Sequence, residues 1–298
     1  GKDTGLGASV GTGVALNDVT NTVQASIDNS VVDTDGTIEL EATSSNTIEA
    51  LAIAGALSVV TGDDLAIAAG ATGALTKNTI ANITRAAITD NEPETTRTVR
   101  AGNTLSLTAT DATIINANAI AGSIDIAVSD STAISVAIGV GISLNDIANQ
   151  TIAIIDGANV TAGGGGVSLA ASSTADIDAN AVSASVGFSS GSSDAAVSYT
   201  TSVSYAENLV QNVVAAEIAG GSIETESSGA VSLTATDSTT IDAVIVSASV
   251  SAAFSSSGSS GSLAVGVTYA LNTVNNSTRA VVRNGASIVA DGTFHAHA

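Results

Sequence analysis

The 298-residue sequence contains no cysteine, methionine or tryptophan, and its single proline is Pro93. The absence of cysteine excludes disulfides, cysteine nucleophiles and cysteine-ligated zinc. With only three Phe and three Tyr, small and β-branched side chains have to form the core. Basic residues are also few, because 7 Lys and Arg stand against 28 Asp and Glu, for a net charge of −21. This charge argues against nucleic acids and anionic membrane surfaces as partners.

The hydrophobic residues that are present, 44% of the chain with a mean hydropathy of +0.40, argue against intrinsic disorder. Ser, Thr, Asn, Asp and Gly interrupt the apolar runs every few residues, so we expect no transmembrane helix and no membrane insertion of this segment. The chain starts without Met and without a signal-peptide pattern. We therefore interpret it as a processed chain or an excerpt of a longer one.

A repeat of about 64 residues runs through the whole chain. The pattern Asn-x-[Val/Ile]-x-Asn occurs five times, and its first Asn recurs at intervals of 61, 67, 63 and 64 residues. Ala always follows eight residues after the first Asn, and Ile or Val ten residues after it. The repeated pair consists of Asn17 and Asn21, Asn78 and Asn82, Asn145 and Asn149, Asn208 and Asn212, and Asn272 and Asn276.

The local pattern within each repeat is typical of strands. Residues 134–144 alternate Ile, Val and Leu with small residues at period 2, and turn pairs such as Asp35-Gly36 separate the runs. We predict an all-β, repetitive β-solenoid with a core of Ala, Val and Ile, which includes Ile155 and Ile218. A right-handed parallel β-helix is the favoured form. The whole chain forms one elongated domain, with repeats of approximately 1–64, 65–131, 132–194, 195–258 and a partial 259–298.

The size of one coil stays open at this point. A repeat of this length fits three coils of roughly 21 residues or two of roughly 32, with neighbouring coils about 4.8 Å apart. The long runs 240–254 and 262–272, on either side of a Ser/Gly tip, could instead be the arms of a hairpin. Phe188 and Phe254 are expected at equivalent repeat positions, as are Tyr205 and Tyr269.

The repeated Asn residues are interpreted as structural. Asn tolerates left-handed corners and satisfies turn backbone, and stacked Asn side chains add hydrogen bonds if the coils repeat directly. A ligand role for them is the less favoured alternative.

Four segments resemble a known kind of protein. Residues 155–171 and 284–294, together with Leu-Asn-Asp-[Val/Ile]-x-Asn at 16–21 and 144–149, resemble coils of giant bacterial secreted β-helix adhesins of the filamentous-haemagglutinin and leukotoxin-A type. This resemblance implies a right-handed β-helix, secretion to the bacterial cell surface, and a role in adhesion or as a stalk. It brings no catalytic residues with it.

Groups that could carry out chemistry are sparse, and we expect no enzyme. His295 and His297 are the only His residues, and they alternate on one strand near the chain end. The pairs Asp176 with Asp178 and Asp63 with Asp64 are carboxylate candidates for polysaccharide cleavage, but the chain has few aromatics to line a sugar groove. No cofactor is expected. Calcium stays open, since acids and Asn at turns supply oxygen ligands, although Gly163–Gly166 lacks the repeat-in-toxin nonapeptide.

One copy of the repeat departs from the others. Leu105 follows Ile88 by 17 positions, whereas the corresponding offset in the other copies is 11 to 13. Insertions in solenoids form surface loops that often lie on a binding face. This loop is our candidate contact site, with a tolerated insertion as the alternative. Its chemistry-bearing residues are Glu92, Pro93, Glu94, Arg97 and Arg100.

These observations favour a structural or adhesive extracellular protein, a β-solenoid segment of a surface fibre that assembles by continuous β-stacking. Its partner is then the chain itself, by end-to-end or lateral assembly, or glycans and proteins of a cell surface. A calcium- or glycan-binding solenoid module is the alternative. A polysaccharide-active enzyme is less favoured because the chain has so few aromatics. An ice-binding protein is less favoured because Thr-x-Thr occurs only in alternate copies, at 108–110 and 234–236.

Overall fold

The computed structural model describes residues 3–92 and 97–298, which form 20 β-strands and no helix. The strands make four parallel sheets of five strands each, which we call sheets A to D. The chain visits the sheets in the order A, B, C, D and then returns to A one position further along the stack. This confirms the predicted all-β parallel solenoid.

The strands of sheets A and D are long. Sheet A contains β1 (Thr4–Val19), β5 (Leu65–Ile80), β9 (Thr132–Ile147), β13 (Ala195–Val210) and β17 (Ser259–Val274). Sheet D contains β4 (Ile38–Gly62), β8 (Thr104–Ser129), β12 (Gly166–Gly191), β16 (Val231–Ser255) and β20 (Phe294–His297).

Sheets B and C consist of short strands. Sheet B contains β2 (Thr22–Asp28), β6 (Ile83–Thr89), β10 (Gln150–Asp156), β14 (Val213–Ala219) and β18 (Ser277–Arg283). Sheet C contains β3 (Val32–Thr34), β7 (Thr98–Ala101), β11 (Asn159–Ala162), β15 (Ser222–Thr225) and β19 (Ser287–Val289).

One coil of the solenoid is one whole repeat. Thr4 pairs with Leu65, Leu65 with Thr132, Thr132 with Ala195, and Ala195 with Ser259, so each coil uses the full 61 to 67 residues. The predicted coils of about 21 or 32 residues are therefore wrong. The long strands of sheet D have 25 or 26 residues, far more than the usual five or six. Because these strands are so long, one repeat is used up by a single turn around the four sheets.

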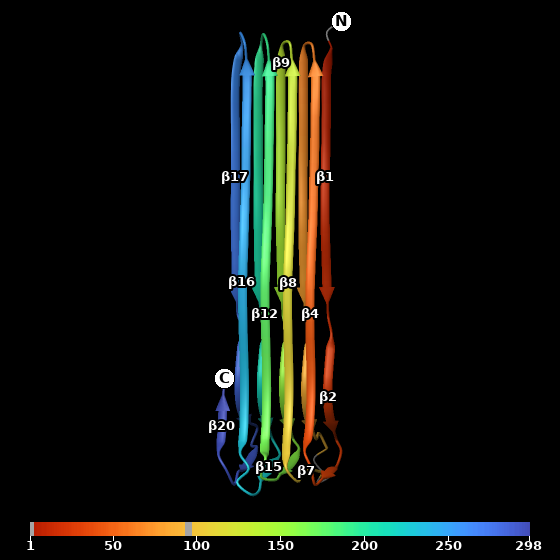
Figure 1. The fold of residues 1–298 in the computed structure, drawn as a ribbon, viewed down its shortest axis with the longest axis vertical. Helices are drawn as coiled ribbons and strands as arrows, with labels where there is room; N and C mark the ends of the chain where they lie inside the picture. The colour runs from red at the N-terminus through yellow and green to blue at the C-terminus, as the bar shows by residue number, and fades with distance from the viewer. Residues whose placement is uncertain (1–2, 93–96) are drawn as a thin grey trace.

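The coils stack into a tall, flat blade (Figure 1). Sheet D runs the whole height, roughly 80 Å at 3.3 Å per residue, and sheets A and B together face it. We call the end where sheet D turns into sheet A the tip, at the top of Figure 1, and the end closed by sheet C the base. The hairpin alternative is wrong, because β16 pairs with β12 and β20 while β17 pairs with β13.

Near the base, the interior is filled by large aliphatic side chains. A second repeated motif, apolar-x-Leu-x-Ala, which is Ile38, Leu40 and Ala42 in the first coil, points inward from sheet D. Its Leu column is buried and consists of Leu40, Leu107, Leu169 and Leu233. Ile27, Ile88, Ile155, Ile218 and Val282 form the facing column on sheet B. Full burial of such side chains stabilises the fold by about 1.5–3 kcal/mol each.

Near the tip, the pattern is reversed. Most inward side chains are Ala, Gly, Ser or Thr, with Val60 and Asp125 as exceptions, and most large aliphatic side chains point outward. The two sheets lie very close there, because a Cβ at Gly11 would sit 2.1 Å from the carbonyl oxygen of Gly55. Hydroxyl pairs such as Ser183 with Ser204, at 2.8 Å between their Oγ atoms, bridge the thin interior. The expectation that Val and Ile fill the core therefore fails here, since residues 134–144 place theirs outside.

Aromatic side chains form contacts between coils. Tyr205 and Tyr269 are in register as predicted, and their rings stack with centroids 5.6 Å apart at an interplanar angle of 4°. Phe188 and Phe254 are not equivalent, because Phe188 pairs with Ala252 and Phe254 with Ser190. Their rings meet diagonally at 5.6 Å and 40°. Such contacts are worth about 0.5–1.5 kcal/mol each beyond area burial.

Candidate interaction surfaces

The repeated Asn residues form two hydrogen-bond ladders along the solenoid axis. In the first ladder, the Nδ2 atom of each Asn donates to the Oδ1 atom of the Asn one coil further on, at 2.7–2.8 Å, in the order Asn17, Asn78, Asn145, Asn208, Asn272. In the second ladder, each backbone N–H donates to the next Oδ1 at 2.9–3.0 Å, in the order Asn21, Asn82, Asn149, Asn212, Asn276. Both ladders have a direction, with donors facing the C-terminal end of the stack.

The second ladder also crosses the interior to sheet D. The Nδ2 atom of Asn149 donates to Asp111 Oδ2 at 2.7 Å and to Thr113 Oγ1 at 2.9 Å. Asn276 makes the same two contacts with Asp237 and Thr239. Burial raises the pKa of Asp111, and these hydrogen bonds oppose the rise. None of the ten Asn residues has a positive φ; the left-handed corner is instead used by Asn29 and Asn284 at the base.

The loop chosen from sequence as a contact site has its arginines engaged within the protein. Arg97 forms ion pairs with Asp90, at 3.1 Å, and with Glu92. Arg100 reaches the preceding coil, where it pairs with Asp33 at 3.0 Å and Asp35 at 3.5 Å. The other two residues of this prediction, Pro93 and Glu94, lie outside the described residues.

The other candidates from sequence are dispersed over the blade. Asp176 and Asp178 point outward from the middle of sheet D, whereas Asp63 and Asp64 lie at the tip. His295 and His297 occupy outward positions on β20, beside Ser232 and Thr234.

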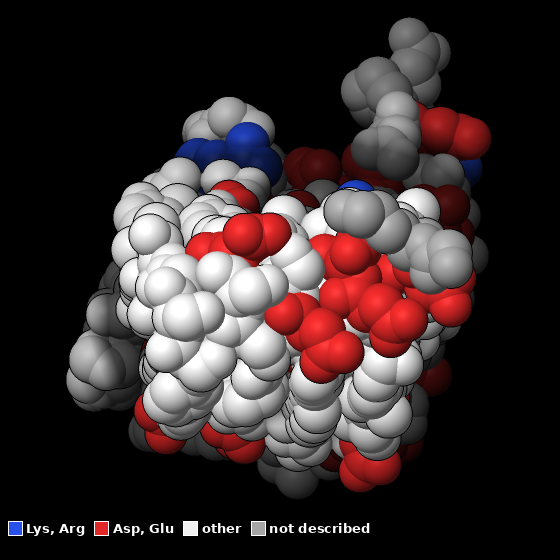
Figure 2. All heavy atoms as spheres, turned by 90° about the horizontal axis from the view of Figure 1, so that it is seen from above, with Lys and Arg blue, Asp and Glu red and all other residues white. Residues whose placement is uncertain are grey.

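Figure 2 looks down on the tip and shows acidic side chains gathered there. A hollow at this end is lined by Asp3, Asp63 and Asp130, together with Thr61, Gly62, Val128 and Ser129. Within the described residues, no group of three or more His, Asp or Glu is placed to hold a metal ion.

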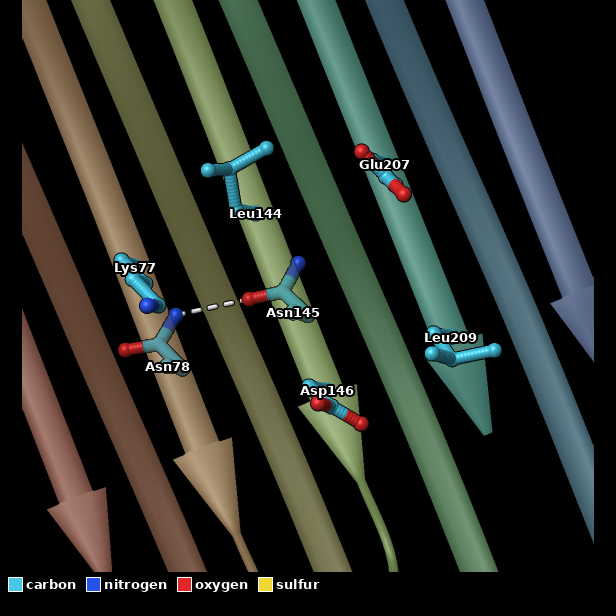
Figure 3. Close-up of a pocket in the computed structure, with 7 residues that line it drawn as sticks. All are labelled: Lys77, Asn78, Leu144, Asn145, Asp146, Glu207 and Leu209. Atoms are coloured by element: carbon cyan, nitrogen blue, oxygen red, sulfur yellow. Dashed lines mark hydrogen bonds between the residues drawn. The ribbon is translucent and has the colours of Figure 1, made fainter. Parts of the chain in front are cut away.

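A shallow pocket lies where the outer side of sheet A meets sheet B. Figure 3 shows Lys77 and Glu207 on either side of Leu144, together with the Asn78–Asn145 hydrogen bond of the first ladder. Lys77 and Glu207 belong to coils two apart, and the apolar Leu144 separates them along the same column. The pocket therefore offers one positive group, Lys77, two negative groups, Glu207 and Asp146, and apolar Leu side chains, without a catalytic arrangement of these residues.

One buried ion-pair cluster ties the last two coils together. The Glu217 side chain is only 3% exposed and accepts hydrogen bonds from Arg279 and Arg283 of the next coil, at 2.8 Å for Arg283 Nη2 to Oε2. Burial acts to raise the pKa of Glu217, but the two guanidinium groups outweigh it and lower this pKa below its usual value of 4.5. The cluster is a cross-coil clamp on the outer side of sheet B.

We expect Glu217→Gln to lower the free energy of unfolding at pH 7 by about 1–2 kcal/mol, because the half-exposed arginines lose their counter-charge. A lowered carboxyl pKa contributes stability above the unfolded-state pKa and loses it as pH falls through the folded-state value. Urea unfolding at pH 7 and pH 3 should therefore show a difference that disappears in acid. The exposed Glu224→Gln is the control, and an equal loss in both variants would contradict the clamp.

Two large apolar surfaces cover the tip half of the blade. The D face consists of the outward side chains of residues 51–61 in β4 and the in-register residues 118–128, 180–190 and 244–254. The A face consists of the outward side chains of residues 6–14 in β1 and the in-register residues 67–75, 134–142, 197–205 and 261–269. Neither surface contains a charged residue. Apolar patches of this size on a protein surface mark interaction sites.

Sequence reasoning missed both faces. The alternation of large and small residues in 134–144 predicted a strand but did not say which set points inward. A signal was present, since Gly and Ser at every second position of a strand leave a thin interior.

Comparison with known proteins found no match: no family model, no curated protein and no solved structure matches the chain. In residues 3–92 and 97–298 there is no helix of the length and apolarity that a membrane span needs.

Proposed function

We propose that this chain is a segment of an extracellular structural or adhesive fibre at a bacterial cell surface, and that the fibre grows along the solenoid axis by continued β-stacking. The observation that carries the proposal is the direction of the Asn ladders. The Asn272 Nδ2 atom and the Asn276 backbone N–H donate to no further Asn, while Asn17 and Asn21 offer Oδ1 atoms that accept from none of the described residues. Another coil set on either end continues both ladders with the correct polarity.

The backbone supports the same proposal. The coil from β1 to β4 and the coil from β17 to β20 each have one neighbour in the stack, so one edge of every strand in them is unpaired. Such edges template pairing with another strand. Because the end coils keep the register of the interior ones, a further coil meets an Asn, Ala and Ile or Val column in the same order. A rod with continuous ladders suits a stalk, whose function is mechanical.

The test is electron microscopy and X-ray diffraction of the purified chain. We expect filaments with a spacing of about 4.8 Å along their axis. Asn272→Asp keeps the acceptor for Asn208 but replaces the outgoing donor by a carboxylate, which repels the Asn17 Oδ1 atom of the next unit. It should shorten the filaments roughly tenfold.

The control for this experiment is Asn159→Asp. It adds the same charge on an interior coil and keeps the acceptor for the Ser222 hydroxyl. Its filaments should match those of the unmodified chain. Isolated blades at every concentration, or filaments that Asn272→Asp leaves unchanged, would contradict axial growth through the ladders.

A further inference from the structure

The D face is exposed although its residues would suit a protein interior. Along one column that crosses all four long strands, Leu57, Ile124, Val186 and Val250 are 63%, 46%, 40% and 59% exposed. These side chains do not hold the blade together, since the side chains that face its interior at this height are small. Their apolar character therefore needs another explanation.

The D face has a regular relief. Its next column consists of the small residues Gly55, Gly122, Ala184 and Ala248, and a hollow opens over this column on β4, β8 and β12. We call this column the groove. The Leu57 column forms a ridge on one side of this groove. The column Ile53, Ile120, Val182 and Val246 forms a second ridge on the other side.

We propose that a second copy of this chain covers the D face, with a twofold axis that runs parallel to the solenoid axis between the groove and the Leu57 ridge. This operation places the Leu57 ridge of each copy in the groove of the other. It brings the second ridge of one copy against the column Val59, Ile126, Phe188 and Ala252 of its partner. The proposal is independent of the axial growth proposed above, because it uses the faces of the blade and not its ends.

The size of the D face fits this occupant. Eleven residues along the strands and four strands across make a footprint of roughly 35 Å by 19 Å, or about 700 Å². Stable interfaces bury about 800 Å² on each partner. The strands in Figure 1 run straight and side by side, and a flat sheet lets a second flat sheet contact it over its whole area.

Acidic side chains border the uncharged D face at both ends. The D face is uncharged, but the outward column next to it towards the base contains Glu49, Asp178 and Asp242. In the proposed pairing the strands of the two copies run antiparallel, so the acidic base halves project beyond opposite ends of the contact. The tip of one copy, with Asp63, then lies beside Glu49 of the other. Two chains of charge −21 repel each other, so we expect pairing to tighten as salt screens this repulsion.

The relief also selects this axis over the alternative one. A twofold axis parallel to the strands would place each column against the same column of the partner. Ridge would then meet ridge, and groove would meet groove, which leaves a void along the contact. Of these two axes, only the one parallel to the solenoid axis places the Leu57 ridge in a groove, and close-packed interfaces require such complementary shapes.

The experiment is analytical ultracentrifugation in the Asn272→Asp background, which reduces axial growth if that proposal holds and leaves the D face intact. We expect a dimer at about 10 µM and at least a roughly 100-fold weaker dimer after Ile124→Glu with Val186→Glu. The matched control is Ile134→Glu with Val197→Glu, the same two changes on adjacent strands of the A face, which should leave the dimer intact. Circular dichroism should show unchanged strand content in both double variants, because all four residues point outward.

A second variant tests the register without adding charge. Ala184→Leu with Ala248→Leu fills the groove and should also weaken the dimer, although it makes the face more apolar. The proposal is overturned if the Asn272→Asp chain stays monomeric up to about 100 µM. It is also overturned if only the A-face double variant dissociates the dimer, or if Ala184→Leu with Ala248→Leu strengthens the dimer. If the unmodified chain forms no filaments but the D-face dimer is present, only the axial proposal is contradicted. If the unmodified chain forms filaments but no D-face dimer, only the present proposal is contradicted.

Discussion

Replacing Ile155 by Asp should unfold the solenoid under conditions where the same replacement at Ile83 leaves it folded. Ile155 is fully buried between Ile88 and Ile218 of the neighbouring coils, in the facing column of the base core. A carboxylate there loses its hydration and gains no hydrogen-bond partner. We expect a loss of at least about 4 kcal/mol in the free energy of unfolding, which is a large part of the stability of a domain.

Ile83 provides a close control because it lies on the same sheet and points outward, with 38% of its surface exposed. Its neighbours in register are Thr22 and Gln150, so a new carboxylate meets no acid there. We expect Ile83→Asp to cost less than about 1 kcal/mol. Thermal and urea unfolding followed by circular dichroism measure both. Similar losses in the two variants would show that Ile155 does not face the core.

Replacing Asp125 by Ser should stabilise the chain at neutral pH. The Asp125 carboxyl is fully buried in the thin interior near the tip, and neither of its oxygens receives a well-formed hydrogen bond. Burial raises the pKa of Asp125 to about 6, and the nearby backbone N–H of Gly70 offsets only part of the rise. The same column holds Ser58 and Ser251 in other coils, so Ser fits the position. The gain expected above pH 7 is about 3 kcal/mol.

The pH dependence tests the cause of this gain. A carboxyl with a folded-state pKa of about 6 and an unfolded-state value near 3.8 destabilises the fold when it is ionised. The unmodified chain should therefore gain stability from this residue as pH falls from 6 to 4, and Asp125→Ser should lack that gain. The control Asp178→Ser removes an exposed carboxylate and should change stability by less than about 0.5 kcal/mol. If Asp125→Ser kept the pH profile of the unmodified chain, that result would refute a buried, strained carboxyl.

The repeat, the strands and the base core could be predicted from sequence because each depends on one column of similar residues. The offsets between Asn, Ala and Ile or Val are the same in all five copies, although the repeats differ in length. Parallel stacking then places these residues in register. The motif from Ile38 to Ala42 recurs in the same way and fills the base.

Columns of similar residues predicted neither the size of one coil nor which side chains face the interior in the tip half. Period-2 alternation says that two sets of side chains face opposite sides, and an Ile-rich set is normally assigned to the core. Here close approach of the two sheets at Gly11 and Gly55 leaves room inside only for small residues, so Ile134 and its neighbours point outward. The ion pairs of the candidate loop could not be predicted either, since sequence does not show that Asp33 and Asp35 of the preceding coil lie beside Arg100.

The measurement that tests the account most directly uses the absence of cysteine. Ladders, end coils and faces all depend on one coil per repeat, which places Ser106 beside Ser168, one coil further on. Ser106→Cys with Ser168→Cys should then form a disulfide on mild oxidation, because paired strands about 4.8 Å apart fall within the usual range of Cα separations. Ser106→Cys with Ala170→Cys, offset by two residues, should remain reduced. Cross-linking of the offset pair, or of neither pair, would contradict a solenoid in which each coil is one repeat.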